Sequence, residues 1–245
     1  LITVEAAKRA GARRVTAVLP YFMYSRSDKK DQSRVPVTAK LMATLLEAAG
    51  VDHVLTCDLH NPAIQAYFNI ICDRVTAKHL LEKYFQEKQI KDMVVVATDA
   101  GSSKKAYKYS KFFECPLALI DKRRESNNDN AVATNIIGDI EGKTAVIFDD
   151  EVSTAGTLAE AAHILKEHGA KEIYAGATHG VLVGPAIERI EKSPIKELVV
   201  TNTIPIEPEK RIDKIKVVSI APLFAEAIKR LNEAKPLGDL FEYDK

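Results

Sequence analysis

Cysteine is scarce in this sequence. Only three cysteines occur among 245 residues, Cys57, Cys72 and Cys115, and no two of them have CxxC spacing. An odd number of scattered thiols predicts neither a disulfide framework nor a zinc site, and it suits a reducing compartment. We therefore expect a cytoplasmic protein.

Net charge and long apolar runs are also lacking. Lys and Arg number 35 and Asp and Glu number 34, which gives a formal net charge of +1. This balance argues against a nucleic-acid-binding protein. No apolar run approaches the roughly 18–20 residues that span a bilayer, and the N-terminus does not resemble a signal peptide. We expect neither nucleic acid nor a membrane as partner.

The length and composition of the sequence are sufficient for two domains. A length of 245 residues, 46% hydrophobic and 28% charged, suits two globular domains of about 100–150 residues with full cores. The first residue is Leu1 rather than Met, and it lies in a segment with a helical pattern. We therefore expect a piece of a longer protein.

Short apolar runs alternate with amphipathic stretches along the chain. The runs, which are rich in Val, Ile and Leu, predict strands at 14–19, 53–58, 93–98, 116–120, 144–148, 172–177, 197–201 and 215–219. The amphipathic stretches predict helices at 2–10, 37–49, 76–87, 102–112, 157–168, 184–191 and 221–232. This alternation predicts an α/β fold with parallel sheets flanked by helices. Two similar units are expected, with a seam near 72–76.

Two polar segments interrupt the pattern. Residues 21–35 and 121–131 are highly charged, and neither has a helical or strand period. Each follows the carboxyl end of an expected strand, where ligands bind in open α/β sheets. We expect two solvated loops that carry ligand-binding side chains.

The strongest local motif is AVIFDDEVSTAGT at 145–157. A buried strand is expected to end in Asp149 and Asp150, and small residues then open a helix. Amide groups at a helix N-terminus can bind a phosphate, and the two carboxylates can accept hydrogen bonds from sugar hydroxyls or hold a hydrated Mg²⁺. The expected phosphate-loop residues are Ser153, Thr154, Ala155, Gly156 and Thr157.

Two further strand ends carry ligand-type residues. His60 follows Asp58 and Leu59 after the strand at 53–58, and imidazole and carboxylate are both competent metal ligands. Asp99 ends the strand at 93–98 and begins a turn of small residues that contains Gly101, followed by Lys104 and Lys105. A carboxylate, exposed amides and ammonium groups suit Mg²⁺ and a pyrophosphate. His53, His79 and His163 are expected at surface or helix positions without a site role, and His179 is assigned no chemistry.

The motif at 145–157 resembles the ribose 5-phosphate loop of phosphoribosyl-pyrophosphate (PRPP) synthetases and of type I phosphoribosyltransferases. Other stretches favour the first group. The resemblance to the ribose-phosphate pyrophosphokinase family extends, in order and spacing, over YSRSDKKDQSR (24–34), CDLHNPAIQAYF (57–68), TDAGSSKKA (98–106), DKRRE (121–125), THGVLVGPAIERI (178–190) and VVTNTIP (199–205). Compared with the family pattern, the chain lacks an N-terminal portion of the first domain.

The resemblance implies a fold of two type I phosphoribosyltransferase-like domains with the active site between them. It assigns 1–73 to an incomplete first domain and 74–227 to a second domain with the ribose 5-phosphate loop, and the tail 228–245 is free to return to the first. It implies homo-oligomers built on dimers, with a hexamer as the larger alternative.

The implied reaction is ATP + ribose 5-phosphate → PRPP + AMP, with Mg²⁺. By resemblance, Lys122 and Arg124 are catalytic, and Arg124 also contacts ribose 5-phosphate. The other implied roles are ATP binding by Arg26, Ser27 and His60, metal binding by His60 and Asp99, pyrophosphate binding by Gly101 and Lys104, and ribose 5-phosphate binding by Asp149, Asp150 and Ser153 to Thr157. The family usually has Gln at 27, Gly at 102 and Arg at 105.

Two alternatives remain from the sequence. A type I phosphoribosyltransferase would consume PRPP, and it would not need the ATP-directed pair Lys122 and Arg124. A non-catalytic, synthetase-like regulatory subunit would have lost catalytic charges, and His60, Asp99, Lys122 and Arg124 are all present.

Overall fold

The computed structural model describes residues 1–124 and 132–241, which form two compact units. The first unit combines both ends of the chain, Leu1–Ala77 and Ile220–Lys245, and the second is Lys78–Ser219. The sequence analysis placed the boundary between the two units slightly earlier, near 72–76. It expected the returning tail to begin at 228, whereas the tail of the first unit begins at 220. Among the described residues, no helix has the length and apolar character needed to cross a membrane.

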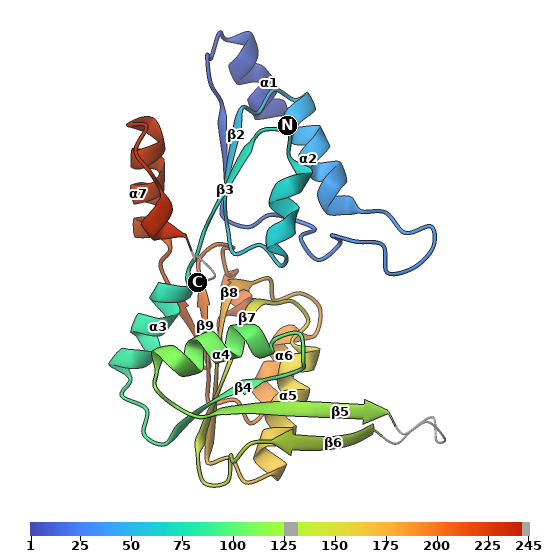
Figure 1. Ribbon diagram of the computed structural model, residues 1–245, viewed down its shortest axis with the longest axis vertical. Helices are drawn as coiled ribbons and strands as arrows, with labels where there is room; N and C mark the ends of the chain where they lie inside the picture. Colours follow the sequence, from blue (N-terminus) through green and yellow to red (C-terminus); the bar gives the residue numbers. More distant parts are fainter. Residues whose placement is uncertain (125–131, 242–245) are drawn as a thin grey trace. The chain divides into compact units, whose positions relative to one another are not determined.

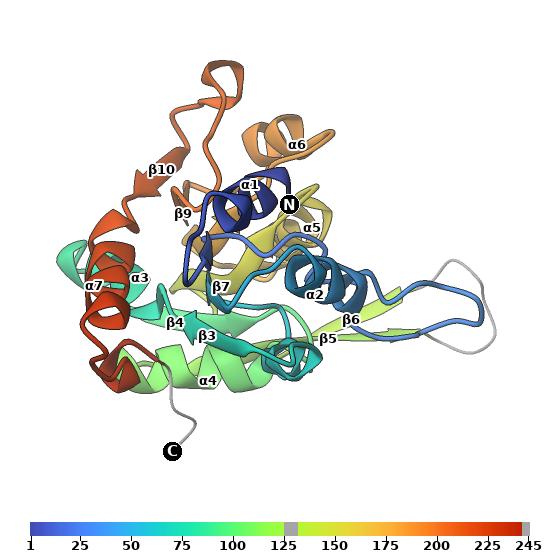
Figure 2. The ribbon, with the colours of Figure 1, turned by 90° about the horizontal axis from the view of Figure 1, so that it is seen from above.

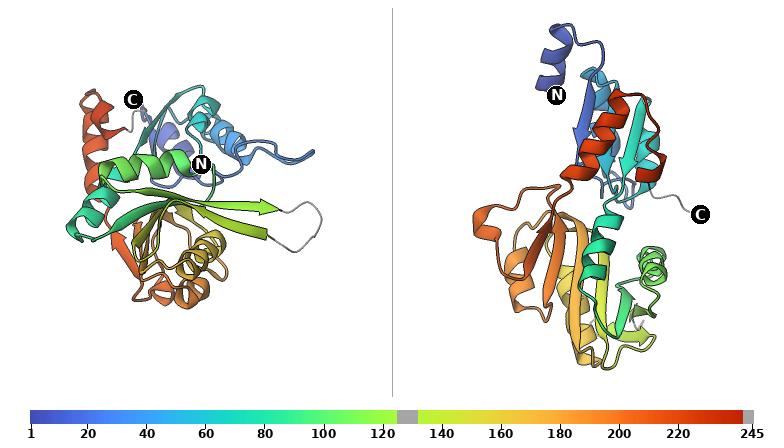
Figure 3. Two further views of the ribbon diagram at one scale, coloured as in Figure 1. Left: turned by 60° about the horizontal axis from the view of Figure 1, so that its bottom comes forward. Right: turned by 90° about the vertical axis from the view of Figure 1, so that its left-hand side faces the viewer.

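The first unit is built on a three-stranded parallel sheet in the order β1-β2-β3. Helices α2 and α7 lie on opposite faces of this sheet (Figures 1 and 3). Its elements are α1 (Ile2–Arg9), β1 (Thr16–Leu19), α2 (Thr38–Ala48), β2 (His53–Cys57), the 3₁₀ helix η1 (Pro62–Tyr67), β3 (Ile71–Val75), α7 (Ala221–Asn232) and η3 (Gly238–Leu240).

The core of the first unit lies between α2 and the sheet. Ala39, Ala43 and Leu46 recur at helical spacing on the buried face of α2 and pack with Val54 of β2. Phe22 completes this core from the segment 21–35. That segment is therefore not a wholly solvated loop, because part of it is folded into the core.

The second unit is built on a seven-stranded sheet in the order β10-β9-β8-β7-β4-β5-β6. Every neighbouring pair is parallel except β5 and β6, which form an antiparallel hairpin. Its elements are α3 (Lys78–Glu87), β4 (Met93–Ala97), α4 (Ser103–Phe112), β5 (Leu117–Arg124), β6 (Val132–Ile137), β7 (Thr144–Val152), α5 (Gly156–Glu167), β8 (Glu172–Gly180), α6 (Ala186–Lys192), β9 (Glu197–Thr201), η2 (Pro208–Lys210) and β10 (Ile215–Val218).

Both faces of this sheet are buried. Side chains of a strand point alternately to the two faces. In β4, Val94 and Val96 pack in the cluster that contains residues of α5 and α6, whereas Val95 and Ala97 pack in the cluster that contains residues of α3 and α4. Continuous apolar runs in the sequence arise from this double burial. The predicted α/β class, with parallel sheets flanked by helices, is confirmed.

Two sequence expectations about the second unit are wrong. Residues 121–124 are not a loop but the end of β5, which pairs with β6 and projects as a long hairpin (Figure 2). Strand β7 does not end before the two acids: it continues to Val152, so that Asp149 and Asp150 lie within the strand, close to its carboxyl end. The remainder of the second polar segment, 125–131, lies outside the described residues.

The strand order identifies where a ligand would bind in the second unit. From β4 the chain continues through α4 to β5 on one side, and from β7 it continues through α5 to β8 on the other. Strands β4 and β7 are adjacent, with Val96 opposite Ile147. The point where two crossovers diverge is the usual binding crevice of open α/β sheets. The Asp99 turn and the 149–157 segment both lie at this edge.

Candidate functional site

The phosphate-type loop connects β7 to α5. Ala155, immediately before the helix, has a left-handed backbone with φ +56° and ψ 14°, and its methyl group is buried. A non-glycine residue adopts this conformation at a cost of about 1–2 kcal/mol. Left-handed residues beside right-handed ones direct successive amide groups into one concavity, which is an anion-binding arrangement. Thr154 and Thr157 are both exposed at this loop.

Three contacts hold the loop in place. The amides of Leu182 and Val183 donate to the carbonyls of Val152 and Ser153, each at 3.0 Å. Arg189 of α6 donates from Nη1 to the carbonyl of Thr154, also at 3.0 Å. Because Arg189 is far away in sequence, the motif analysis missed it. It fixes the loop and adds a permanent positive charge next to it.

Gly156 lies against the same contact. A Cβ at this position would lie 3.1 Å from Nη1 of Arg189, closer than a Cβ normally approaches another atom. A larger residue would push the guanidinium away from the loop. Gly156 and Arg189 therefore act as a matched pair.

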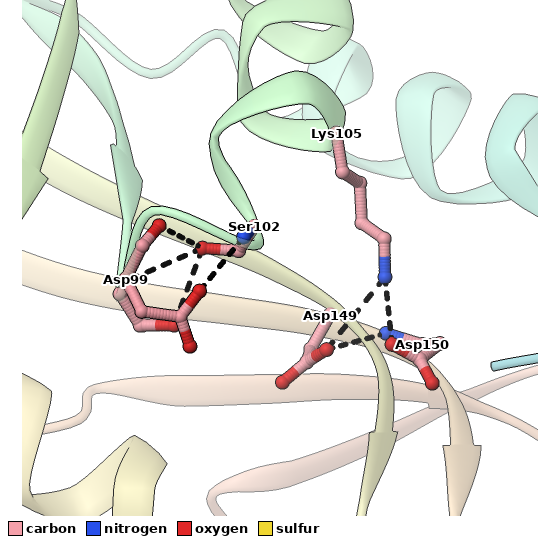
Figure 4. A network of polar contacts seen from close by, with 6 residues as sticks. Asp99, Ser102, Lys105, Asp149 and Asp150 are labelled. Carbon is pink, nitrogen blue, oxygen red and sulfur yellow. Dashed lines mark hydrogen bonds and ion pairs between the residues drawn. The ribbon is translucent and has the colours of Figure 1, made fainter. Parts of the chain in front are cut away.

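The acid pair at the end of β7 is bound by a lysine from α4 (Figure 4). Nζ of Lys105 lies 2.7 Å from Oδ1 of Asp150 and 3.6 Å from Oδ1 of Asp149. The amide of Asp150 donates to Oδ1 of Asp149 at 2.8 Å. The sequence suggested Lys105 as a phosphate contact, whereas in this structure its partners are the two carboxylates.

The pKa of Asp149 is raised well above the ordinary value of an aspartate. Removal from bulk water raises the pKa of Asp149 from 3.8 to about 7; the Lys105 ammonium opposes this rise, and the neighbouring Asp150 adds to it. The side chain nevertheless keeps an exposed fraction of 43%. Water reaches the carboxyl group and limits the penalty. A polar ligand can also reach it from solvent.

The turn after β4 is closed by Asp99 and Ser102 (Figure 4). Oδ1 of Asp99 accepts the amide of Ser102 at 2.7 Å, and the amide of Asp99 donates to Oγ of Ser102 at 3.2 Å. A Cβ on Gly101 would lie 3.3 Å from Oδ1 of Asp99. Within residues 1–124 and 132–241, Oδ2 of Asp99 has no hydrogen-bond or ion-pair partner. One oxygen is thus held and the other remains available for a ligand. Lys104 lies in the first turn of α4 and is exposed.

In the first unit, the turn after β2 presents His60. Asp58 has a positive φ of 33°, its amide donates to the carbonyl of Val75 at 3.1 Å, and its Oδ2 accepts the amide of Ala77 at 2.9 Å. These contacts fix the backbone just before His60, whose side chain is exposed. Asp58 therefore supports the turn.

Ser27 and Arg26 lie in the segment before α2. Oγ of Ser27 accepts the amide of Thr38 at 3.3 Å and lies 3.2 Å from its hydroxyl, so this side chain helps to start α2. Arg26 is exposed. The predicted nucleotide contacts of both residues remain predictions.

The structure places the backbones of Lys122 and Arg124 on β5, opposite Thr134 and Val132 of β6. Their catalytic roles remain predictions. Of the histidines, His53 is buried rather than at the surface, and its Nε2 lies 2.8 Å from Oδ2 of Asp73. His179 is also buried, and its Nδ1 lies 2.9 Å from Oγ1 of Thr203.

A loop of this type beside acidic side chains, at the point where the crossovers of a doubly wound sheet diverge, is typical of α/β proteins that bind phosphorylated ligands. Two family models match the sequence: the N-terminal domain of ribose phosphate pyrophosphokinase over residues 1–50 and the phosphoribosyl synthetase-associated domain over residues 125–242.

Similar proteins cover nearly the whole chain. A ribose-phosphate pyrophosphokinase of Caldanaerobacter subterraneus is 54% identical over 98% of this chain and 76% of its own length. One from Clostridium acetobutylicum is 51% identical over 99% of this chain and 76% of its own. The crystal structure of phosphoribosylpyrophosphate synthetase from Mycobacterium smegmatis matches with a TM-score of 0.89 and 41% identity, over 95% of this chain and 76% of that one. The chain belongs to the ribose-phosphate pyrophosphokinase family.

Proposed function

We propose that this chain is a ribose-phosphate diphosphokinase, which transfers the pyrophosphoryl group of ATP to the anomeric hydroxyl of ribose 5-phosphate and yields PRPP and AMP. The observation that carries the proposal is the acid pair and phosphate-type loop at the end of β7, next to the Asp99 turn, in a chain 54% identical to a ribose-phosphate pyrophosphokinase.

Ribose 5-phosphate would bind at the end of β7. The amides and hydroxyls of Ser153 to Thr157 would donate to the 5-phosphate, with Ala155 and Gly156 allowing the ligand to approach the backbone closely. Asp149 and Asp150 would accept hydrogen bonds from the ribose hydroxyls. Lys105 would orient these carboxylates and favour their charged form.

ATP would bind through five residues. Arg26, Ser27 and His60 would contact the nucleotide, and Gly101 and Lys104 would contact its pyrophosphate. Mg²⁺ would neutralise charge on the transferred group when it is bound. His60 and Asp99 are its proposed ligands, and Oδ2 of Asp99, which has no hydrogen-bond or ion-pair partner among the described residues, suits a hard cation.

The residues fit a metal that enters with its substrate. Within the described residues, no three His, Cys, Asp or Glu side chains are grouped so that they could hold a metal ion. Mg²⁺ is commonly held by one or two carboxylates together with substrate phosphates. We therefore expect weak Mg²⁺ binding by the free protein and marked binding when ATP is present. Tight binding without nucleotide that survives Asp99→Ala would contradict this assignment.

Lys122 and Arg124 would supply positive charge at the transferred phosphoryl group. Such transfers depend on in-line positioning and charge stabilisation rather than on covalent help from the protein. The anomeric hydroxyl would attack the β-phosphorus, the bond to the α-phosphate oxygen would break, and AMP would leave. Arg124 would also contact ribose 5-phosphate.

The direct test is AMP formation from ATP, with and without ribose 5-phosphate, measured on the chain as given. The proposal requires AMP and PRPP in equal amounts only when both substrates are present. A type I phosphoribosyltransferase would instead consume added PRPP and release pyrophosphate with a nitrogenous base. A chain that binds ribose 5-phosphate but forms no AMP would be a non-catalytic subunit.

Assembly and location complete the proposal. We expect a homo-oligomer based on a dimer, with the hexamer as the larger alternative, and sedimentation at micromolar concentration would test it: a monomer alone would contradict it. We assign the chain to the cytoplasm because Cys57, Cys72 and Cys115 are all unpaired thiols.

A further inference from the structure

Asp28 is a buried carboxylate in a segment otherwise rich in exposed charge. The residue is only 4% exposed. Oδ2 of Asp28 accepts a hydrogen bond from Nδ2 of Asn61 at 2.7 Å, and the hydroxyl of Tyr67 donates to the backbone carbonyl of Asp28. A buried charge is retained only when it is well hydrogen-bonded, so these contacts define the position of Asp28.

Asn61 is held at both ends of its amide group. While Nδ2 donates to Asp28, Oδ1 accepts the amide of Ala63 at 3.0 Å and caps the 3₁₀ helix η1. The side chain therefore links a helix start to the segment before α2. It cannot rotate without losing one of the two hydrogen bonds.

The linked residues flank two proposed ATP contacts. Arg26 comes two residues before Asp28, and His60 comes directly before Asn61. The Asp28–Asn61 hydrogen bond is thus the short connection between two backbone segments that are 33 positions apart in sequence. Together with the contact from the Tyr67 hydroxyl to the Asp28 carbonyl, it ties the segment that carries Arg26 to the segment that carries His60.

We infer that Asp28 and Asn61 are positioning residues for ATP, which hold the segments of Arg26 and His60 at the separation that the nucleotide requires. The inference rests on the proposed function, because it takes Arg26 and His60 as nucleotide contacts. Neither Asp28 nor Asn61 needs to touch ATP. Their effect is on nucleotide affinity, and it is transmitted through the backbone of the two segments.

The pair offers a charge-swap experiment. In Asn61→Asp, two carboxylates face each other at the distance of a hydrogen bond, and one must move or take up a proton. In the double variant Asp28→Asn with Asn61→Asp, the amide group stands at position 28 and can donate to the carboxylate at position 61. That carboxylate can still accept the amide of Ala63. The double variant therefore restores both side-chain hydrogen bonds of the original pair.

Asn69→Asp is the matched control. Nδ2 of Asn69 donates to Oε2 of Glu47 at 2.8 Å, so the change again sets two carboxylates against each other with the same change of net charge. This second pair joins α2 to the segment after η1, and neither partner is adjacent to a proposed nucleotide contact. Asn69→Asp therefore measures the effect on stability and on ATP affinity of disrupting an Asn–carboxylate pair that has only a structural role.

Two readouts are needed: calorimetric binding of Mg²⁺–ATP and the KM values of both substrates in PRPP formation. Because Asn61→Asp replaces a hydrogen bond to a charged group with two opposed carboxylates, it should weaken ATP binding about 10-fold or more and raise the KM for ATP. The KM for ribose 5-phosphate should change less than about twofold. The double variant should recover most of the ATP affinity. Asn69→Asp should lower the melting temperature and leave the ATP affinity unchanged.

Several results would overturn the inference. One is a double variant that stays as weak as Asn61→Asp, since the defect would then come from the added charge beside His60. Another is an equal loss for both substrates. If the parent chain binds Mg²⁺–ATP but forms no PRPP, the proposed activity fails while calorimetry still decides the inference. If the parent binds no ATP, the inference fails.

Discussion

Lys122 is the single residue on which the proposed chemistry depends most directly. Its backbone lies on β5 in the projecting hairpin. Loss of one well-placed charged donor typically costs about 10²–10³ in rate. Lys122→Ala should lower kcat and kcat/KM by about that factor with little change in KM, because the charge would act mainly in the transition state.

The control for Lys122 is another lysine. Lys83 of α3 is 74% exposed, and its ion pair with Glu87 is long, at 3.9 Å. Lys83→Ala should leave PRPP formation unchanged, and both variants should keep the free energy of unfolding within about 0.5 kcal/mol. Steady-state kinetics and chemical denaturation measure the two effects. More than half of the parental activity in Lys122→Ala would remove this residue from the mechanism.

Asp149 gives a pH dependence of defined sign. A carboxyl group whose pKa is raised in the folded state stabilises the fold when it is protonated, and this contribution is lost as pH rises through the folded pKa. The window runs from the ordinary value of 3.8 to about 7. Relative to Asp149→Asn, which does not titrate, the parent chain should lose stability as pH rises from the ordinary pKa to the folded one.

Asp139 supplies the opposite case on the same unit. Its hydrogen bond with Lys143 lowers the pKa of Asp139, so its contribution is present above the ordinary value and is lost as pH falls. Relative to Asp139→Asn, the parent should therefore gain stability as pH rises through the acid range. Melting temperatures measured in parallel across pH would show the two trends. If the difference in melting temperature between the parent and Asp149→Asn changed with pH in the same direction as the difference between the parent and Asp139→Asn, the environment assigned to Asp149 would be contradicted.

At the scale of elements, the β7–α5 loop and α6 are predicted to act together. Arg189→Ala removes the donor to the Thr154 carbonyl, and Gly156→Ala places a Cβ where the guanidinium lies. Each should weaken binding of ribose 5-phosphate about 10-fold, as expected for the loss of one hydrogen bond. Because both act on one contact, the double variant should lose little more than either alone. Calorimetry tests this, and fully additive losses would show that Gly156 and Arg189 act separately.

Most helices and strands could be predicted because burial produces a recognisable pattern of apolar residues in the sequence. The double-sided core of the second unit produced continuous apolar runs, and every helix except the short 3₁₀ segments had an amphipathic period. Strands β3 and β6 were missed for a physical reason. The residues of β3 are largely outside the core, with Ile71 64% exposed, and β6 pairs only with β5 at the edge of the sheet.

The candidate site was predictable only where it is local. The acids and small residues at 149–157 are contiguous, and the Asp99 turn follows an obvious strand. Arg189 and the Asp28–Asn61 pair were missed because their partners are 35 and 33 positions away. Such contacts depend on the packing of separate elements, which no local pattern encodes.

At the scale of the whole molecule, ligand binding should stabilise the two units unequally. At a ribose 5-phosphate concentration of 100 times Kd, binding adds about 2.7 kcal/mol to the stability of the state that binds. The proposed loop belongs entirely to Lys78–Ser219. Hydrogen exchange should slow across β7 and α5 with ribose 5-phosphate, and inorganic phosphate should act in the same direction more weakly. Unchanged exchange in α5 at saturating ligand would contradict the loop assignment.

The first unit has one more property, which follows from the path of the chain. Its sheet is made early, but α7 and the segment around Leu240, whose carbonyl accepts the amide of Thr76, come from the last residues. On the ribosome, at about 5–20 residues per second, the intervening segment takes on the order of ten seconds to emerge. The second unit can fold as it emerges, while the earlier strands have α2 on one face but still lack α7 on the other. We therefore expect the second unit to complete its fold before the first, although the strands of the first are synthesised earlier. In the meantime the incomplete sheet of the first unit exposes apolar surface, to which a chaperone is expected to bind.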